Sequence, residues 1–195
     1  MLSLLVEGFG AAWLPCSLVL VVPGVATVLA GREYAGPAAA AYALGTALLS
    51  WLRFADIGGD FPLLVPAVAL AVAAVLLVIP TSVPPGLAAV IGGGLAGGAA
   101  AELWEPCVGV EFGTLLNGLP DDGLGGLATL AVYLLGVLAP IGGVMALLRL
   151  LPPHLVDATA GALAVVGGAA LAVMAIATAI GLHDDVVAQL FVWSL

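Results

Sequence analysis

The sequence predicts an all-α polytopic membrane protein with six transmembrane helices, arranged in one domain as two inverted three-helix repeats. Hydrophobic residues make up 64% of the 195 residues and charged residues 8%, whereas a soluble domain carries about 25% charged residues. Short polar or Pro/Gly-rich breaks separate apolar stretches, and a span needs about 20 apolar residues. A Pro-Cys pair also occurs in each half of the chain. Together these observations indicate a helical membrane protein with internal repetition.

The excess of acidic residues limits the kinds of molecule that the protein can bind. The chain has three basic and twelve acidic residues and a formal net charge of −9. Nucleic acids and anionic lipid headgroups require clustered Lys and Arg, so we expect the lipid bilayer itself, and no nucleic acid, as a partner. The N-terminal segment MLSLLVEGFGAAWLPC lacks the basic region of a secretory signal and is predicted to be the start of a retained first span.

The six spans follow from the breaks. Their predicted ranges are about 5–30, 37–52, 61–79, 87–116, 124–148 and 155–182, and the tail 186–195 is predicted to lie at the membrane interface. An even number of spans places both termini on one side. Arg32 and Arg149 fall on the opposite side and Arg53 on the side of the termini. The positive-inside rule then predicts a multi-pass protein of the cell (inner or plasma) membrane with both termini extracytoplasmic.

The two Pro-Cys pairs define the repeat. Pro15-Cys16 lies in the first predicted span and Pro106-Cys107 in the fourth, so the cysteines are 91 residues apart (107 − 16). The half-repeats cover about 1–83 and 84–185. Each half contains three spans, an odd number, and the second half therefore enters the membrane from the opposite side. Inverted repeats of this kind place their site near the bilayer midplane.

Each proline is expected to break its helix beside a cysteine. Proline has no N–H and clashes with the carbonyl four residues earlier, which would free the carbonyls of Ala11 and Glu102. Non-helical backbone at membrane depth must be buried in protein or border water, so a cavity is expected beside the thiols. Two such thiols can exchange a disulfide or bind a soft cation such as mercuric or cuprous ion. A third interpretation is simple packing of cysteine as a small hydrophobe.

The Pro-Cys segments resemble those of a known family. AAWLPCSLVLVVPG and LWEPCVGVEFGTLLNGL are similar to the two Pro-Cys segments of the CcdA family of cytochrome c biogenesis proteins and of the transmembrane domain of the disulfide reductase DsbD. AYALGTALLSWL resembles the second span of that family. Two departures are Val19 and Val110, where the family usually has a further proline soon after each cysteine.

The resemblance implies a function. Cys16 and Cys107 would form a redox pair that takes electrons from a cytoplasmic thioredoxin-like protein. The pair would pass them to an extracytoplasmic thioredoxin-like acceptor, as in cytochrome c maturation. The expected activity is that of a protein-disulfide reductase. No P-loop, Rossmann glycine pattern or His-Cys zinc cluster occurs in the sequence, and no cofactor is expected.

Three acidic residues surround the second cysteine. Glu102, Glu105 and Glu111 would be functional candidates if they lie within a span, and Glu111 could shuttle a proton because it shares a helix face with Cys107 at i+4. Alternatively, the fourth span ends near Leu103 and these acids are in water. Negative charge disfavours a thiolate, so Cys16 is predicted to form the mixed disulfide with the donor and Cys107 to resolve it.

The remaining candidates are structural. Pro23, Pro66 and Pro140 are possible hinges or kinks, and the glycines at 92–94 and 97–98 are expected to allow close helix packing. The four tryptophans are predicted to be interface anchors; they are Trp13, Trp51, Trp104 and Trp193.

Overall fold

The computed structural model describes residues 2–54, 61–104, 124–150 and 152–182, together with Asp185 and residues 188–189. Every element within these ranges is helical. In chain order they are α1 (Leu2–Ala11), α2 (Pro15–Ala30), the short 3-10 helix η1 (Arg32–Tyr34), α3 (Ala35–Phe54), α4 (Leu64–Val78), α5 (Pro85–Leu103), α7 (Leu124–Val137), α8 (Ala139–Leu150) and α9 (Pro153–Ala179). The predicted interfacial tail lies almost entirely outside the described residues.

Several of these helices can cross a membrane. Three are long and apolar enough by themselves, Ala35–Phe54, Pro85–Leu103 and Ala158–Ala179, and the number rises to five if each of two bent helix pairs is one span. The chain is therefore an all-helical protein with three to five candidate spans among the described residues. The third predicted span, 61–79, forms only the 15-residue α4, which is shorter than the roughly 20 residues that a span needs.

Proline determines where the two bent pairs break. Helices α1 and α2 meet at 88°, and α7 and α8 meet at 49°. Pro15 is the first residue of α2, a position at which the missing N–H costs nothing, and Pro140 is the second residue of α8. The predicted break at Pro15 and kink at Pro140 are thus confirmed. Pro66, in contrast, lies in the first turn of α4, where proline is tolerated.

The carbonyl of Ala11, which Pro15 was predicted to free from its helical hydrogen bond, finds a donor in the turn before the proline. It accepts a 3.0 Å hydrogen bond from the N–H of Leu14, three residues later in the chain.

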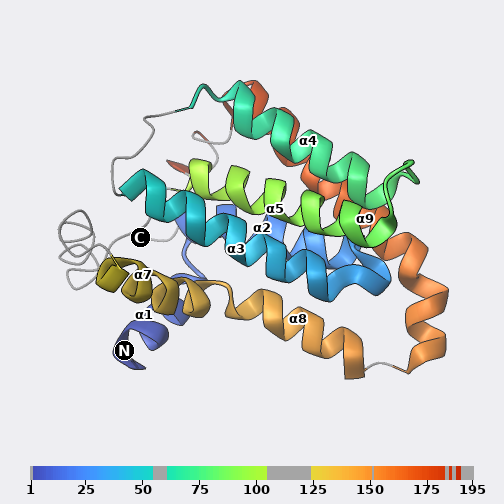
Figure 1. Cartoon of the computed structure of the whole chain (residues 1–195), viewed down its shortest axis with the longest axis horizontal. Helices are drawn as coiled ribbons and strands as arrows, with labels where there is room; N and C mark the ends of the chain where they lie inside the picture. Colours follow the sequence, from blue (N-terminus) through green and yellow to red (C-terminus); the bar gives the residue numbers. More distant parts are fainter. Residues whose placement is uncertain are drawn as a thin grey trace.

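Glycines hold the centre of the molecule together. Figure 1 shows α3 and α5 side by side, with α4 and α9 paired along one edge of the molecule and α8 along the opposite edge. A Cβ at Gly93 or Gly97 of α5 would overlap the backbone carbonyls of Ala38 or Tyr42 in α3. The expectation of close helix packing at these glycines is confirmed, because the two backbones touch where side chains are absent.

Candidate functional site

Cys16 lies at the start of a helix, directly after the 88° break. It is the second residue of α2, it is only 4% exposed, and it is disulfide-bonded. The sequence contains one other cysteine, Cys107. That residue lies outside the described residues, as do the candidates Glu105, Pro106 and Glu111.

The local backbone explains how Cys16 is presented. Leu14 is extended (φ −78°, ψ 147°), and its carbonyl accepts a 3.0 Å hydrogen bond from the N–H of Ser17. The proline ring then fixes the first helical φ angle and directs the chain into α2. A helix N-terminus carries partial positive charge and favours a nearby negative charge. The sulfur of Cys16 therefore lies at the end of α2 that best accommodates a thiolate.

The second Pro-Cys segment follows the C-terminal end of α5. This helix ends at Leu103, whereas the fourth span was predicted to reach as far as residue 116; residues 105–116 lie outside the described part of the chain. Glu102 is in the last turn of α5 and is partly exposed, and its Oε1 atom accepts a 3.2 Å hydrogen bond from the N–H of Phe61. For Glu102, the geometry matches the alternative in which the helix ends near Leu103.

Arg53 contacts the same end of α5. Its Nη1 donates to the backbone carbonyl of Glu102 and lies 3.5 Å from the carbonyl oxygen of Trp104. Pro106 was predicted to free the carbonyl of Glu102 from an intrahelical hydrogen bond, and this carbonyl accepts its hydrogen bond from Arg53 of α3 instead. Nothing local in the sequence predicts this contact, because the two residues are 49 positions apart.

Trp104 belongs to a buried aromatic cluster. It is 1% exposed, its ring stacks on Tyr133, and Phe54 meets it edge-on with ring centroids 5.8 Å apart. The prediction that Trp104 anchors the protein at the membrane interface is wrong, because α3 and α7 cover the indole. Trp13 is 66% exposed, as an interface anchor would be, and its ring meets the ring of Phe9 edge-on.

The buried face of α3 is polar, which sequence reasoning missed. Tyr42, Thr46 and Ser50 recur every four residues and are all fully buried. The hydroxyl of Tyr42 donates to the carbonyl of Leu20 in α2 at 2.5 Å, and Thr46 donates to the carbonyl of Gly97 in α5 at 3.2 Å. Ser50 Oγ has no hydrogen-bond partner among the described residues. Side chains of α3 thus connect α2 and α5, the two described helices that adjoin the Pro-Cys segments.

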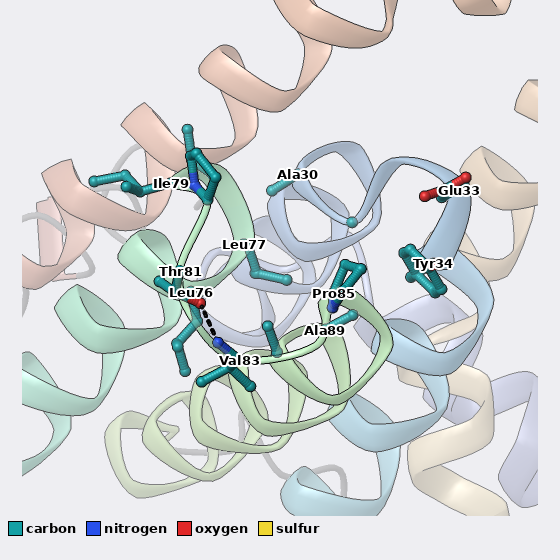
Figure 2. Close-up of a pocket in the computed structure, with 14 residues that line it drawn as sticks. Ala30, Glu33, Tyr34, Leu76, Leu77, Ile79, Thr81, Val83, Pro85 and Ala89 are labelled. Atoms are coloured by element: carbon teal, nitrogen blue, oxygen red, sulfur yellow. Dashed lines mark hydrogen bonds between the residues drawn. The ribbon is translucent and has the colours of Figure 1, made fainter.

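A cavity of about 550 Å³ lies at the other end of α2 (Figure 2). It is lined by the ends of α2 and α4, by the start of α5 and by the segment in which Val83 N–H donates to Thr81 Oγ1 at 3.4 Å. Ala30, which lines it, is fourteen residues beyond Cys16 in the same helix, or about 21 Å at 1.5 Å per residue. This cavity is therefore separate from the cysteine, which is itself buried.

The sequence holds a repeat signal that extends beyond Pro-Cys. Trp13-Leu-Pro-Cys and Trp104-Glu-Pro-Cys share the pattern Trp-x-Pro-Cys, and Tyr42-Ala-Leu-Gly and Tyr133-Leu-Leu-Gly share Tyr-x-Leu-Gly. Both patterns recur at the spacing of the cysteines, 91 residues. The helix packing repeats in the same way. Helix α3, which contains Tyr42, packs on α5, and helix α7, which contains Tyr133, packs on α1. This signal could have identified Tyr42 and Tyr133 as paired core positions from the sequence.

No protein-family model, curated protein or solved structure matches the chain. The resemblance to the CcdA family thus depends on the segments quoted above, and its functional implications stay predictions.

Proposed function

We propose that this chain is a transmembrane thiol-disulfide oxidoreductase that carries electrons, with Cys16 and Cys107 as its redox pair. The observation that carries the proposal is the disulfide bond of Cys16, buried at the start of α2 directly after an 88° break. Cys107 is the only other cysteine in the sequence, and it occupies the equivalent position of the repeated Trp-x-Pro-Cys pattern.

The reaction is a pair of thiol-disulfide exchanges. A thiolate of a reduced thioredoxin-like donor attacks one sulfur of the disulfide, and the other sulfur leaves as a thiolate and takes up a proton. The second thiol of the donor then displaces the attacked cysteine, so the donor is oxidised and the pair becomes a dithiol. The dithiol reduces a disulfide of an extracytoplasmic thioredoxin-like acceptor by the same two steps. Two electrons cross the membrane in each cycle, and no cofactor is required.

We infer that six spans in two inverted repeats form the framework. The repeated patterns at 91 residues support this arrangement. The packing between the two halves supports it too. The helix before each Pro-Cys pair, α1 or α5, packs on the helix of the other half that contains Tyr-x-Leu-Gly, α7 or α3. Both contacts use a glycine: a Cβ at Gly45 or at Gly136 would meet backbone atoms of the opposite helix. An inverted arrangement in the cell membrane, with both termini extracytoplasmic, would expose the pair to each side in turn.

A soft-metal transporter is the competing interpretation. Mercuric or cuprous ion binds thiolate sulfur, and a disulfide sulfur offers no such charge. The disulfide bond of Cys16 is a state that the exchange cycle requires and that metal transport does not.

The decisive experiment compares redox exchange with metal uptake. Purified protein in proteoliposomes would be incubated with reduced thioredoxin, quenched in acid and labelled with a maleimide that adds mass to each free thiol. We expect no label on the oxidised protein, two labels after reaction with thioredoxin, and stoichiometric oxidation of thioredoxin. Cys16→Ser and Cys107→Ser variants should abolish turnover. Equal labelling of oxidised and reduced protein would refute the proposal, and mercuric-ion uptake that is lost in Cys16→Ser would establish the transporter instead.

A further inference from the structure

A second cavity, of about 430 Å³, lies at the end of the molecule where α2 and α8 finish and α3 begins. Its volume falls within the roughly 300–1,000 Å³ of sites that hold small molecules. Helices α8 and α9 both pack on α2 but lie along opposite edges of the molecule (Figure 1). Apolar side chains of these three helices line the cavity, namely Val28, Leu29, Met145, Leu148, Ala160 and Leu163.

Two side chains of opposite charge line the same cavity. Glu33 belongs to η1, and Arg149 lies in the last turn of α8. Neither side chain forms an ion pair or a hydrogen bond with another residue in the described part of the chain. The guanidinium of Arg149 lies against the start of α3, where its Nη2 is 3.6 Å from the position that a Cβ on Gly36 would occupy. A carboxylate and a guanidinium are thus both free to bind a ligand.

This pair of charges is complementary to a ligand that carries both signs. A guanidinium matches the oxygens of a phosphate group, and a carboxylate accepts hydrogen bonds from an ammonium group. Anionic lipids are a poorer match, because their sites require clustered Lys and Arg, and here a carboxylate lines the cavity beside Arg149. The apolar wall in turn suits hydrocarbon chains, which a small soluble zwitterion lacks.

The position of the cavity fits the same ligand. Helices α3 and α9 contain candidate spans, and α2 and α8 belong to the two bent pairs that can each form one. The ends of spans lie at the level of the lipid headgroups, and the two charged residues occupy such an end.

We propose that this cavity binds a zwitterionic phospholipid with a primary ammonium group, such as phosphatidylethanolamine. Arg149 binds the phosphate, Glu33 binds the ammonium, and the side chains of α2, α8 and α9 contact the acyl chains. The inference is independent of the proposed redox function, because it uses no cysteine, and either proposal can fail without the other.

The test measures which lipid the purified full-length protein retains. Delipidated protein in detergent would be incubated with equal amounts of phosphatidylethanolamine, phosphatidylcholine and phosphatidylglycerol that have the same acyl chains, and examined by native mass spectrometry. Phosphatidylethanolamine should bind most. Phosphatidylcholine should bind less, because its trimethylammonium group cannot donate a hydrogen bond to Glu33, and phosphatidylglycerol least, because it offers Glu33 no cation. Equal or tighter binding of phosphatidylglycerol would overturn the proposal.

Substitutions separate the two contacts. Arg149→Gln should weaken all three lipids roughly three- to tenfold, since they share the phosphate and water screens part of the interaction. Glu33→Gln should weaken phosphatidylethanolamine by a similar factor and leave phosphatidylglycerol unaffected, so the preference between them is lost. Asp185→Asn, which removes an exposed acid beyond the C-terminal end of α9, is the matched control and should behave like the parent. All of these side chains are exposed, so the variants are expected to fold.

Two further outcomes would overturn the proposal. One is a Glu33→Gln variant that keeps the lipid preference of the parent. The other is displacement of bound phosphatidylethanolamine by an excess of glycerophosphoethanolamine, which carries the same charges without acyl chains. Displacement would show that the ligand is a soluble zwitterion and that the apolar wall contributes nothing, whereas retention of the lipid supports the site as described.

Discussion

Trp104 stacks on Tyr133 with ring centroids 6.4 Å apart and an interplanar angle of 23°. Its counterpart in the first half, Trp13, precedes the other Pro-Cys pair at the same offset but is 66% exposed. The two halves thus use the same residue differently: one indole fills the core beside the second Pro-Cys segment, and the other faces the surroundings.

This difference predicts unequal effects of substitution. Trp104→Ala removes a buried ring that also meets Phe54 edge-on, and should lower the free energy of unfolding by about 3–5 kcal/mol. Trp13→Ala loses one edge-on contact with Phe9, which is worth about 0.5–1.5 kcal/mol. Unfolding in mixed micelles with increasing denaturing detergent, followed by circular dichroism, measures both. Equal losses would show that Trp104 is not a core residue.

Close contact of α3 and α5 gives a second prediction. A Cβ at Gly97 would overlap the backbone carbonyl of Tyr42, and neither backbone can move without separating the helices. Gly97→Ala should therefore destabilise the protein by about 1–3 kcal/mol, as overpacking does. Gly161→Ala in α9 is the matched control, because nothing lies within 4 Å of the added Cβ. It should leave stability unchanged or raise it by up to about 1 kcal/mol through helix propensity. A neutral Gly97→Ala would contradict the observed packing.

A third prediction concerns the polar face of α3. Tyr42→Phe removes the buried hydroxyl that donates to Leu20 at 2.5 Å, at an expected cost of about 1–3 kcal/mol. Tyr34→Phe, at the rim of the 550 Å³ cavity (Figure 2), should change stability by less than about 0.5 kcal/mol. Thermal unfolding in detergent, followed by intrinsic fluorescence, compares the two. If the variants melt together, the contact between α3 and α2 carries no net stability.

Pro15, Trp104 and Arg53 show which features of the structure can be predicted from the sequence and which cannot. The break at Pro15 was predictable because it is local: a proline without an N–H starts a helix wherever it stands. The burial of Trp104 was not, since it depends on α3 and α7 covering the indole, and a tryptophan in an apolar stretch fits a core and an interface equally well. The contact of Arg53 with Glu102 joins positions 49 residues apart, and no periodicity encodes it. The repeat with a spacing of 91 residues could have been identified from the sequence alone, because Tyr-x-Leu-Gly recurs at the same spacing as Trp-x-Pro-Cys.

The last prediction assigns different roles to the two cysteines. Cys16 lies at the N-terminus of α2, where negative charge on sulfur is favoured, and Cys107 has three glutamates nearby in sequence. We therefore expect Cys16 to form the mixed disulfide with the donor and Cys107 to resolve it. Because Cys16 is 4% exposed while disulfide-bonded, attack also requires an opening around the break between α1 and α2.

A trapping experiment tests this order. The probe is a thioredoxin that lacks its resolving cysteine and carries thionitrobenzoate on the remaining one, so that an attacking thiolate displaces the thionitrobenzoate anion and forms a mixed disulfide. Each single-cysteine variant would be incubated with the probe and run on a non-reducing gel. Cys107→Ser should form a stable adduct through Cys16, Cys16→Ser should form little, and wild type should release the probe because Cys107 resolves the adduct. An adduct with Cys16→Ser alone would reverse the assignment, and no adduct with either variant would exclude thioredoxin as the donor.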